Sequence, residues 1–133
     1  MAKIIYPSVS DLIEVNRIVL EQIKVSKADR SGPLAGGMGI LEETVKKMKK
    51  RKGDIYDKVM VLFEGIIRNH PFSSGNRRTG IVSTAAFMEV NGKELNIVKE
   101  TGIIQGVRER YYKESEIKKW LKGGEVREFD RFH

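Results

Sequence analysis

At the middle of the 133-residue chain lies the segment His70-Pro71-Phe72-Ser73-Ser74-Gly75-Asn76-Arg77-Arg78-Thr79-Gly80. It places a histidine, which can act as a base, close to two glycines and two adjacent arginines. Residues on both sides of the segment carry apolar side chains at helical spacing. A residue that precedes proline disfavours the helical conformation, so the first of these helices should end at or just before His70. The segment is therefore predicted to be a loop between two helices.

The two flanking helices are expected over residues 54–69 and from residue 76 or 77 to residue 90. The first carries a core face formed by Val59, Leu62, Phe63, Ile66 and Ile67. The second is apolar around most of its circumference, which is typical of a buried helix, and we expect it to be the central helix of the fold. Asn76 is a favourable N-cap for it.

Further helical patterns cover residues 8–25, 40–51, 98–111 and 115–121, so the chain is predicted to be an all-α bundle of about six helices. Ser8 and Asp11 fit a capping box at the first helix, and Trp120 is interpreted as a core anchor in the last. The glycine-rich residues 27–39 predict a surface loop or short flap. We expect one domain over residues 1–133, with a charged tail over about 124–133 that is loose.

Composition restricts the classes of function. The chain has no cysteine and only two histidines, His70 and His133, which excludes disulfides, thiolate metal sites and histidine-rich zinc sites. It has no membrane-spanning apolar run and no recognisable signal peptide, so a cytoplasmic location is expected. The net charge of +7 favours phosphates, nucleic acids or acidic proteins as partners. The basic cluster at residues 46–52 is interpreted as a solvated helix end, with nucleic-acid binding as the alternative.

The central segment also predicts an anion site. The N-terminus of a helix presents unpaired N–H groups and a partial positive charge, which bind phosphate readily. Gly75 allows close approach of the backbone, and Arg78 offers a planar cation that suits bidentate contact with phosphate. Arg77 adds a second charge whose direction the sequence does not give. His70 lies across the same loop, where it can take a proton from an attacking hydroxyl, although a histidine at a helix end can also simply cap the turn.

The sequence His-Pro-Phe-x-x-Gly-Asn-Arg-Arg-Thr-Gly over residues 70–80 resembles the signature of the Fic/Doc family, and the resemblance extends over nearly the whole chain to the short Doc branch. It implies an all-α fold and transfer of a nucleotide-derived group to a protein hydroxyl. The roles that it implies are general base for His70 and loop anchor for Phe72. It further implies a nucleotide- and phosphate-binding set formed by Ser73, Ser74, Gly75, Asn76, Arg77 and Arg78.

The position of Arg77 separates the branches of this family. Members that transfer AMP usually carry glycine there, whereas the Doc branch carries lysine and phosphorylates a translation factor. The resemblance thus implies a toxin that moves a phosphoryl group from ATP, or another nucleoside triphosphate, to a Ser, Thr or Tyr hydroxyl of a target protein. AMP transfer is the alternative. A separate antitoxin is the further partner that the Doc branch implies, and neither nucleic acid nor a membrane is expected as a partner.

One position departs from the family pattern. The acidic residue that holds magnesium on the donor phosphates in that family falls at Ser74. Mg²⁺ is still expected, but it would be bound more weakly, either by phosphates and water or by another acid that the sequence does not identify. The remaining alternative is a weak or inactive member that only binds a nucleotide or a protein.

Overall fold

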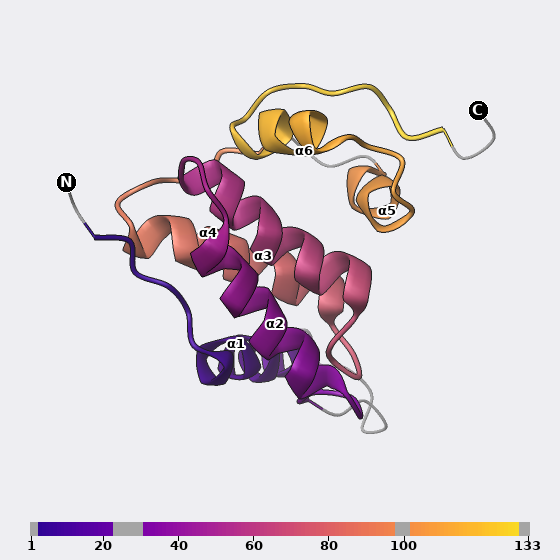
Figure 1. The fold of residues 1–133 in the computed structure, drawn as a ribbon. Helices are drawn as coiled ribbons and strands as arrows, with labels where there is room; N and C mark the ends of the chain where they lie inside the picture. The colour runs from indigo at the N-terminus through magenta and orange to yellow at the C-terminus, as the bar shows by residue number, and fades with distance from the viewer. Residues whose placement is uncertain (1–2, 23–30, 98–101, 131–133) are drawn as a thin grey trace.

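The computed structural model describes residues 3–22, 31–97 and 102–130, and within these ranges the chain forms helices and no strand (Figure 1). The helices are α1 (Val9–Gln22), α2 (Gly37–Lys50), α3 (Ile55–Asn69), α4 (Asn76–Val90), α5 (Ile103–Arg108) and α6 (Glu114–Leu121). The prediction of an all-α fold with six helices is confirmed. No helix in the described ranges is long and apolar enough to cross a membrane.

Helix α3 is the centre of the bundle. It packs against α2, α4, α5 and α6, while α1 packs against α4 and α2 on the far side from α5 and α6 (Figure 1). Its apolar residues recur at helical spacing, and Phe63 and Ile66 are completely buried. Trp120 of α6 is also completely buried, and its ring centroid lies 5.7 Å from that of Phe63. Burial of side chains of this size stabilises the fold by about 1.5–3 kcal/mol each. Trp120 is thus the core anchor that the sequence predicts, and it fixes α6 on α3.

The expectation that the helix after the central loop is the hub is wrong. Two of the apolar residues that suggested burial, Val82 and Val90, are 40% and 57% exposed. The buried side of α4 consists largely of small residues, among them Thr79, Ser83 and Thr84. The hydroxyl of Thr84 donates to its own helix backbone, which satisfies it inside the core. Small residues therefore let α4 lie close to α3, and apolar residues on its other side face outward.

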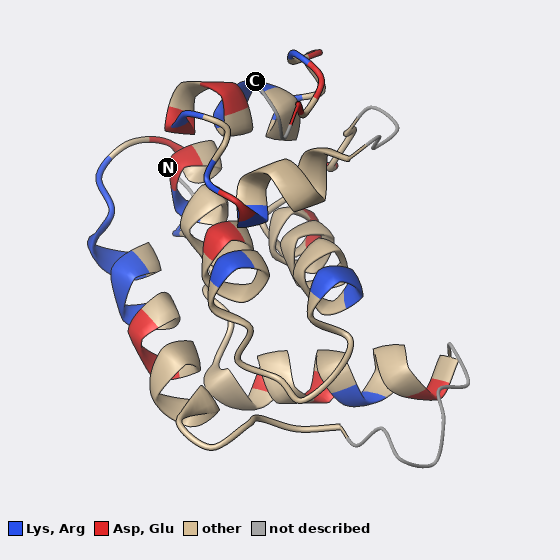
Figure 2. Cartoon of the chain, turned by 90° about the vertical axis from the view of Figure 1, so that its right-hand side faces the viewer, with Lys and Arg blue, Asp and Glu red and all other residues tan. Residues whose placement is uncertain are grey.

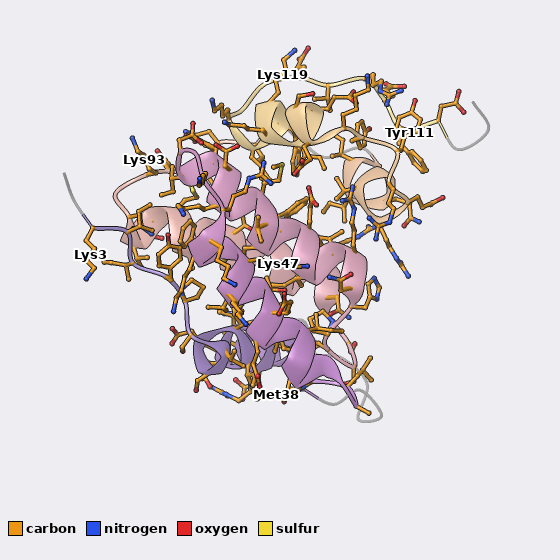
Figure 3. The ribbon with its side chains drawn as sticks, viewed as in Figure 1. Lys3, Met38, Lys47, Lys93, Tyr111 and Lys119 are labelled. Carbon is orange, nitrogen blue, oxygen red and sulfur yellow. The ribbon has the colours of Figure 1, made fainter. Side chains whose placement is uncertain are left out.

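Helix α2 begins at Gly37, three residues earlier than predicted, because Gly36 adopts the left-handed conformation and ends the preceding segment. A side chain at Gly37 would clash with the backbone oxygen of Pro71, so the first turn of α2 lies against the central loop. Met38 at this end and Lys47 further along α2 mark its course in Figure 3. Basic residues gather in its last turn, as Figure 2 shows, and Lys47, Lys49 and Lys50 are exposed there.

The terminal parts of the bundle match the predictions less closely. The capping box at α1 is confirmed, because the Ser8 hydroxyl accepts from the Asp11 N–H and the Asp11 carboxylate accepts from the Ser8 N–H. The expected end of this helix near Val25 lies outside the described residues, as do residues 98–101 and His133. Helix α5 is shorter than predicted, because Gly102 in the left-handed conformation precedes it. Residues 124–130 run back along α6 and α5 (Figure 1), and the ring of Phe129 packs edge-on against that of Tyr111.

Candidate functional site

His70 stands at the C-terminal end of α3. Its backbone is left-handed (φ 48°, ψ 61°), and its N–H donates to the carbonyl oxygen of Ile66 at 3.2 Å. The helix thus ends before Pro71, as the sequence predicts. A residue other than glycine in the left-handed region costs about 1 kcal/mol or more, so the surrounding contacts must hold this turn. The turn directs the chain from α3 across to the start of α4.

The loop between His70 and α4 is fixed from inside. The Phe72 side chain is buried in the core at 1% exposure. The Asn76 side chain accepts from the Phe72 N–H at 3.0 Å and donates to the Phe72 oxygen at 2.9 Å. The prediction that Asn76 is the N-cap of α4 is therefore wrong. The N-cap is Gly75, and the Asn76 amide instead bonds to the backbone of Phe72. This pair of hydrogen bonds gives the loop one defined shape before any ligand arrives.

The predicted flap is visible from residue 31 onward, and it lies directly against the loop. Pro33 and Phe72 form an isolated antiparallel bridge. The Leu34 N–H donates to the Pro71 oxygen at 2.8 Å, and the Ser73 N–H donates to the Gly32 oxygen at 3.2 Å. These backbone contacts join the segment before α2 to the segment that carries the motif. Residues 23–30, the remainder of the predicted connection, lie outside the described residues.

Asn16 of α1 ties these two segments to α4. Its side chain is fully buried, and its Nδ2 donates to the Ser74 oxygen at 2.9 Å and to the Thr79 hydroxyl at 3.1 Å. Its Oδ1 accepts from the Gly32 N–H at 2.8 Å. Asn16 is not among the site residues that the motif predicts. Its signal was present, because a polar residue stands four positions after Leu12 and four before Leu20, inside an apolar stripe.

The start of α4 has the geometry of an anion site. Gly75 is left-handed (φ 75°, ψ 19°), and a Cβ there would lie 2.9 Å from a methyl carbon of Leu20, so only glycine fits without displacement. The N–H of Thr79 is the first in the helix to bond within it, to the Gly75 oxygen. The N–H groups of residues 76–78 are therefore the free ends of the helix dipole. Arg77 and Arg78 are both exposed beside them.

The structure distinguishes the two arginines. Arg77 shares a small cavity of about 40 Å³ with His70, and the other residues that line it are Ile67, Ile104 and Arg108. Arg78 does not line this cavity. Arg108 belongs to α5, and nothing in the sequence indicated that it would approach His70.

The surroundings lower the pKa of the His70 imidazole. Burial contributes most, and the positive charge of Arg108 adds to it. Both causes disfavour the protonated ring. The lowered pKa favours the neutral imidazole at neutral pH, and this is the form of the ring that can accept a proton.

The remaining predicted residues lie on the same loop. Ser73 is exposed, and Ser74 is partly exposed, with its backbone oxygen held by Asn16. Ser74 offers at most a neutral hydroxyl to a metal ion. Within residues 3–22, 31–97 and 102–130, no cluster of three or more His, Asp or Glu side chains could hold a metal. The described residues therefore form no cluster that could hold a metal without further ligands from the donor phosphates or water.

A larger cavity of about 570 Å³ lies between α2 and α3. Its walls combine Glu43, Glu64 and Glu114 with basic residues that include Lys47 and Arg110. The charges in it are mixed, and His70 and the start of α4 do not line it. The smaller cavity is the one that His70 lines, together with Arg77 from the first turn of α4.

Comparison with known proteins identifies the family of the chain. The model of the Fic/DOC family matches residues 6–88, which is more than half of the chain and includes the whole loop from His70 to Arg78. The match ends in α4, so α5 with Arg108 lies beyond it. No curated protein matches the chain.

Proposed function

This chain belongs to the Fic/DOC family, whose members transfer nucleotidyl or phosphoryl groups to proteins, and we propose that it phosphorylates a hydroxyl of a target protein. The proposed donor is ATP or another nucleoside triphosphate. The acceptor is a Ser, Thr or Tyr hydroxyl, and by resemblance to the Doc branch the target is a translation factor.

In the proposed reaction the hydroxyl oxygen of the target attacks the γ-phosphorus of the donor. His70 takes the hydroxyl proton as the new phosphorus–oxygen bond forms. The bond between the γ-phosphorus and the bridging oxygen breaks, and the nucleoside diphosphate leaves. The N–H groups at the start of α4 and the Arg78 guanidinium hold the donor phosphates, so that catalysis consists mainly of positioning and charge stabilisation.

The observation that supports this proposal most directly is the position of His70 relative to α4. A base with a lowered pKa and a free helix N-terminus stand at the two ends of one loop, and Arg77 reaches the cavity at the base. Asn76 and Asn16 fix this loop through five hydrogen bonds to its backbone and its neighbours. A simple connection between two helices requires none of these arrangements.

Phosphoryl transfer is favoured over AMP transfer by Arg77. AMP-transferring members of the family usually have glycine at this position, whereas the Doc branch has a long cationic side chain. The Arg77 side chain lies beside His70, where it narrows the space at the base. In AMP transfer the hydroxyl would instead attack the α-phosphorus and pyrophosphate would leave.

A second candidate is a protein that binds nucleotide or protein but transfers nothing. Ser74 favours it, because the family obtains its metal-binding carboxylate from this position, and no Asp or Glu is among the described residues that line the cavity at His70. Exchange of Ser74 for aspartate tests this reading. A strong rise in transfer on Ser74→Asp would indicate that the carboxylate was the missing part.

The experiment that tests the proposed reaction uses ATP labelled at either the α or the γ phosphate, incubated with the protein and a cell extract. Label on protein from the γ position alone supports phosphoryl transfer, and label from the α position supports AMP transfer. If neither wild type nor Ser74→Asp transfers label while ATP still binds, the binding-only candidate holds.

We also propose a separate antitoxin as a partner, by resemblance to the Doc branch. Expression of the protein alone should then stop growth, and co-expression of a small neighbouring gene product should restore it. Harmless expression of a chain shown to transfer label, together with the absence of such a neighbouring gene, would contradict this part of the proposal.

A further inference from the structure

The loop that carries Ser74, at the position of the family's metal-binding acid, has two arginines on its His70 side. Ser74 supplies no carboxylate, and its backbone oxygen already accepts from Asn16. On the His70 side of the same loop, the cavity of about 40 Å³ is lined by Arg77 and Arg108. Among the residues that the structure describes, no carboxylate lines that cavity. The site therefore lacks the negative charge of the family's acid, and Arg108, which lies outside the family match, adds a positive charge beside that of Arg77.

Two guanidinium groups at one cavity repel each other unless an anion lies between them. In the described part of the chain, neither Arg77 nor Arg108 has a nitrogen within 4 Å of a carboxylate oxygen. The arginines that do form ion pairs there are Arg17, Arg51, Arg68 and Arg127. The Arg108 charge also acts on the His70 imidazole. An uncompensated pair of arginines beside a base is a favourable site for a phosphate, whose oxygens each guanidinium can bind in bidentate fashion.

The fold holds the backbone of Arg108 in this place, and the side chain is exposed. The preceding residue, Val107, is completely buried, and its oxygen accepts from Nε of Arg68 at 2.7 Å. Arg68 is itself held on α3 by an ion pair with Glu64 at 2.7 Å. Ile104, one turn before Arg108, is buried and lines the same cavity. Helix α5 is thus attached to the end of α3 at the point where its last residue faces His70.

We propose that Arg77 and Arg108 form a phosphate subsite that supplies to the donor the positive charge which a carboxylate-held metal supplies elsewhere in the family. This inference rests on the proposed function, because it concerns the same donor. The cavity exceeds the roughly 10–15 Å³ that one ordered water needs, so it admits phosphate oxygens. Arginine keeps its charge at any physiological pH and requires no metal ligand from the chain.

ATP binding measured by calorimetry, with Mg²⁺ present or removed by EDTA, tests the subsite. Wild type is expected to bind in EDTA with a dissociation constant within about tenfold of that in Mg²⁺. Arg108→Gln should weaken binding in EDTA by about 10- to 100-fold, the range for loss of a charge-assisted contact. Arg108→Lys keeps the charge but loses the planar fork, and it should fall between them.

Arg110→Gln is the matched control, because Arg110 stands two residues further on, is exposed and lines the other cavity. It removes the same charge and should leave ATP affinity unchanged. The proposal is overturned if Arg108→Gln binds ATP in EDTA as tightly as wild type. It is also overturned if Arg110→Gln loses as much affinity, because the effect would then be one of net charge.

Inorganic tripolyphosphate separates failure of this inference from failure of the proposed donor. If wild type binds tripolyphosphate in a manner that depends on Arg108 but binds neither ATP nor GTP, the subsite stands and the nucleoside triphosphate donor is wrong. If it binds none of the three, both proposals are overturned.

Discussion

Asn16 gives the most specific prediction about the site. Its amide joins the segment before α2, the motif loop and α4 through bonds to Gly32, Ser74 and Thr79. We consider Asn16→Ala, which removes all three hydrogen bonds, and Asn16→Asp, which has the same size. The aspartate can still accept from Gly32 but cannot donate, and it places a carboxylate oxygen against the Ser74 oxygen. Both changes should release the loop from α1 while they leave the apolar core intact.

The cost of Asn16→Ala follows from these contacts. A hydrogen bond contributes a net of about 0.5–1.5 kcal/mol, and a buried group left without its partner costs more. Three bonds, one of them fully buried, give a decrease of about 2–4 kcal/mol in the free energy of unfolding. For a chain of this size that corresponds to a fall of about 10 °C in the melting temperature.

Asn91→Ala is the matched control for Asn16→Ala. Asn91 also makes three hydrogen bonds, to the Ile5 N–H, the Ile5 oxygen and the Phe87 oxygen, but at the opposite end of α4. Both variants should lose stability in urea unfolding. Both variants are then compared at a temperature at which each is folded. Only Asn16→Ala should show weaker ATP binding and slower transfer of label per folded molecule. If folded Asn16→Ala binds and transfers like Asn91→Ala, Asn16 is merely structural and the reasoning fails.

Three further predictions concern packing and protonation. Gly65→Ala should lower the free energy of unfolding by about 1–3 kcal/mol, because a Cβ at Gly65 would lie 2.5 Å from the Thr44 hydroxyl oxygen. Adding Thr44→Ala should restore most of that stability. Melting curves of the two single variants and the double variant test this. Lys58→Met should lower the free energy of unfolding by about 1–3 kcal/mol, because the buried Lys58 amine donates to two carbonyl oxygens at the end of α2. A midpoint of urea unfolding equal to that of wild type would contradict this. In the pH profile of kcat/KM, the apparent pKa of the acid limb should lie below the ordinary histidine pKa of about 6.5. The reason is that the His70 pKa is lowered and the neutral ring is the active form. Arg108→Gln should move that limb to higher pH, and a profile that does not shift would be evidence against His70 as the titrating base.

Much of the fold follows from local signals that the sequence contains. The bounds of α3 and α4 were predicted to within one residue, because apolar spacing defines their bodies and Pro71 and Gly75 define the ends that face the loop. The predicted start of α2 at residue 40 is three residues too late, because the glycine-rich sequence before it favours a loop. Gly37 instead lies within the helix, where the close approach of the Pro71 oxygen requires glycine. Local propensity cannot show such a tertiary contact.

The site was only partly predictable for the same reason. The motif itself gives His70 and the helix N-terminus, which are adjacent in sequence. Asn16 and Arg108 reach the loop from α1 and α5, so their contribution depends on packing that no short pattern encodes. That α3 and not α4 is the central helix likewise depends on tertiary packing, because apolar residues on one side of α4 are left uncovered by neighbouring helices.

The central claim is that His70 acts as the base for transfer to a protein hydroxyl. The most direct measurement compares wild type and His70→Ala in a single-turnover transfer of γ-labelled phosphate to protein, with ATP affinity measured in parallel. His70→Ala should bind ATP as wild type does and transfer label about 10²- to 10⁴-fold more slowly, the range for loss of a general base. Transfer by His70→Ala at the wild-type rate, with ATP bound equally well, would contradict the account.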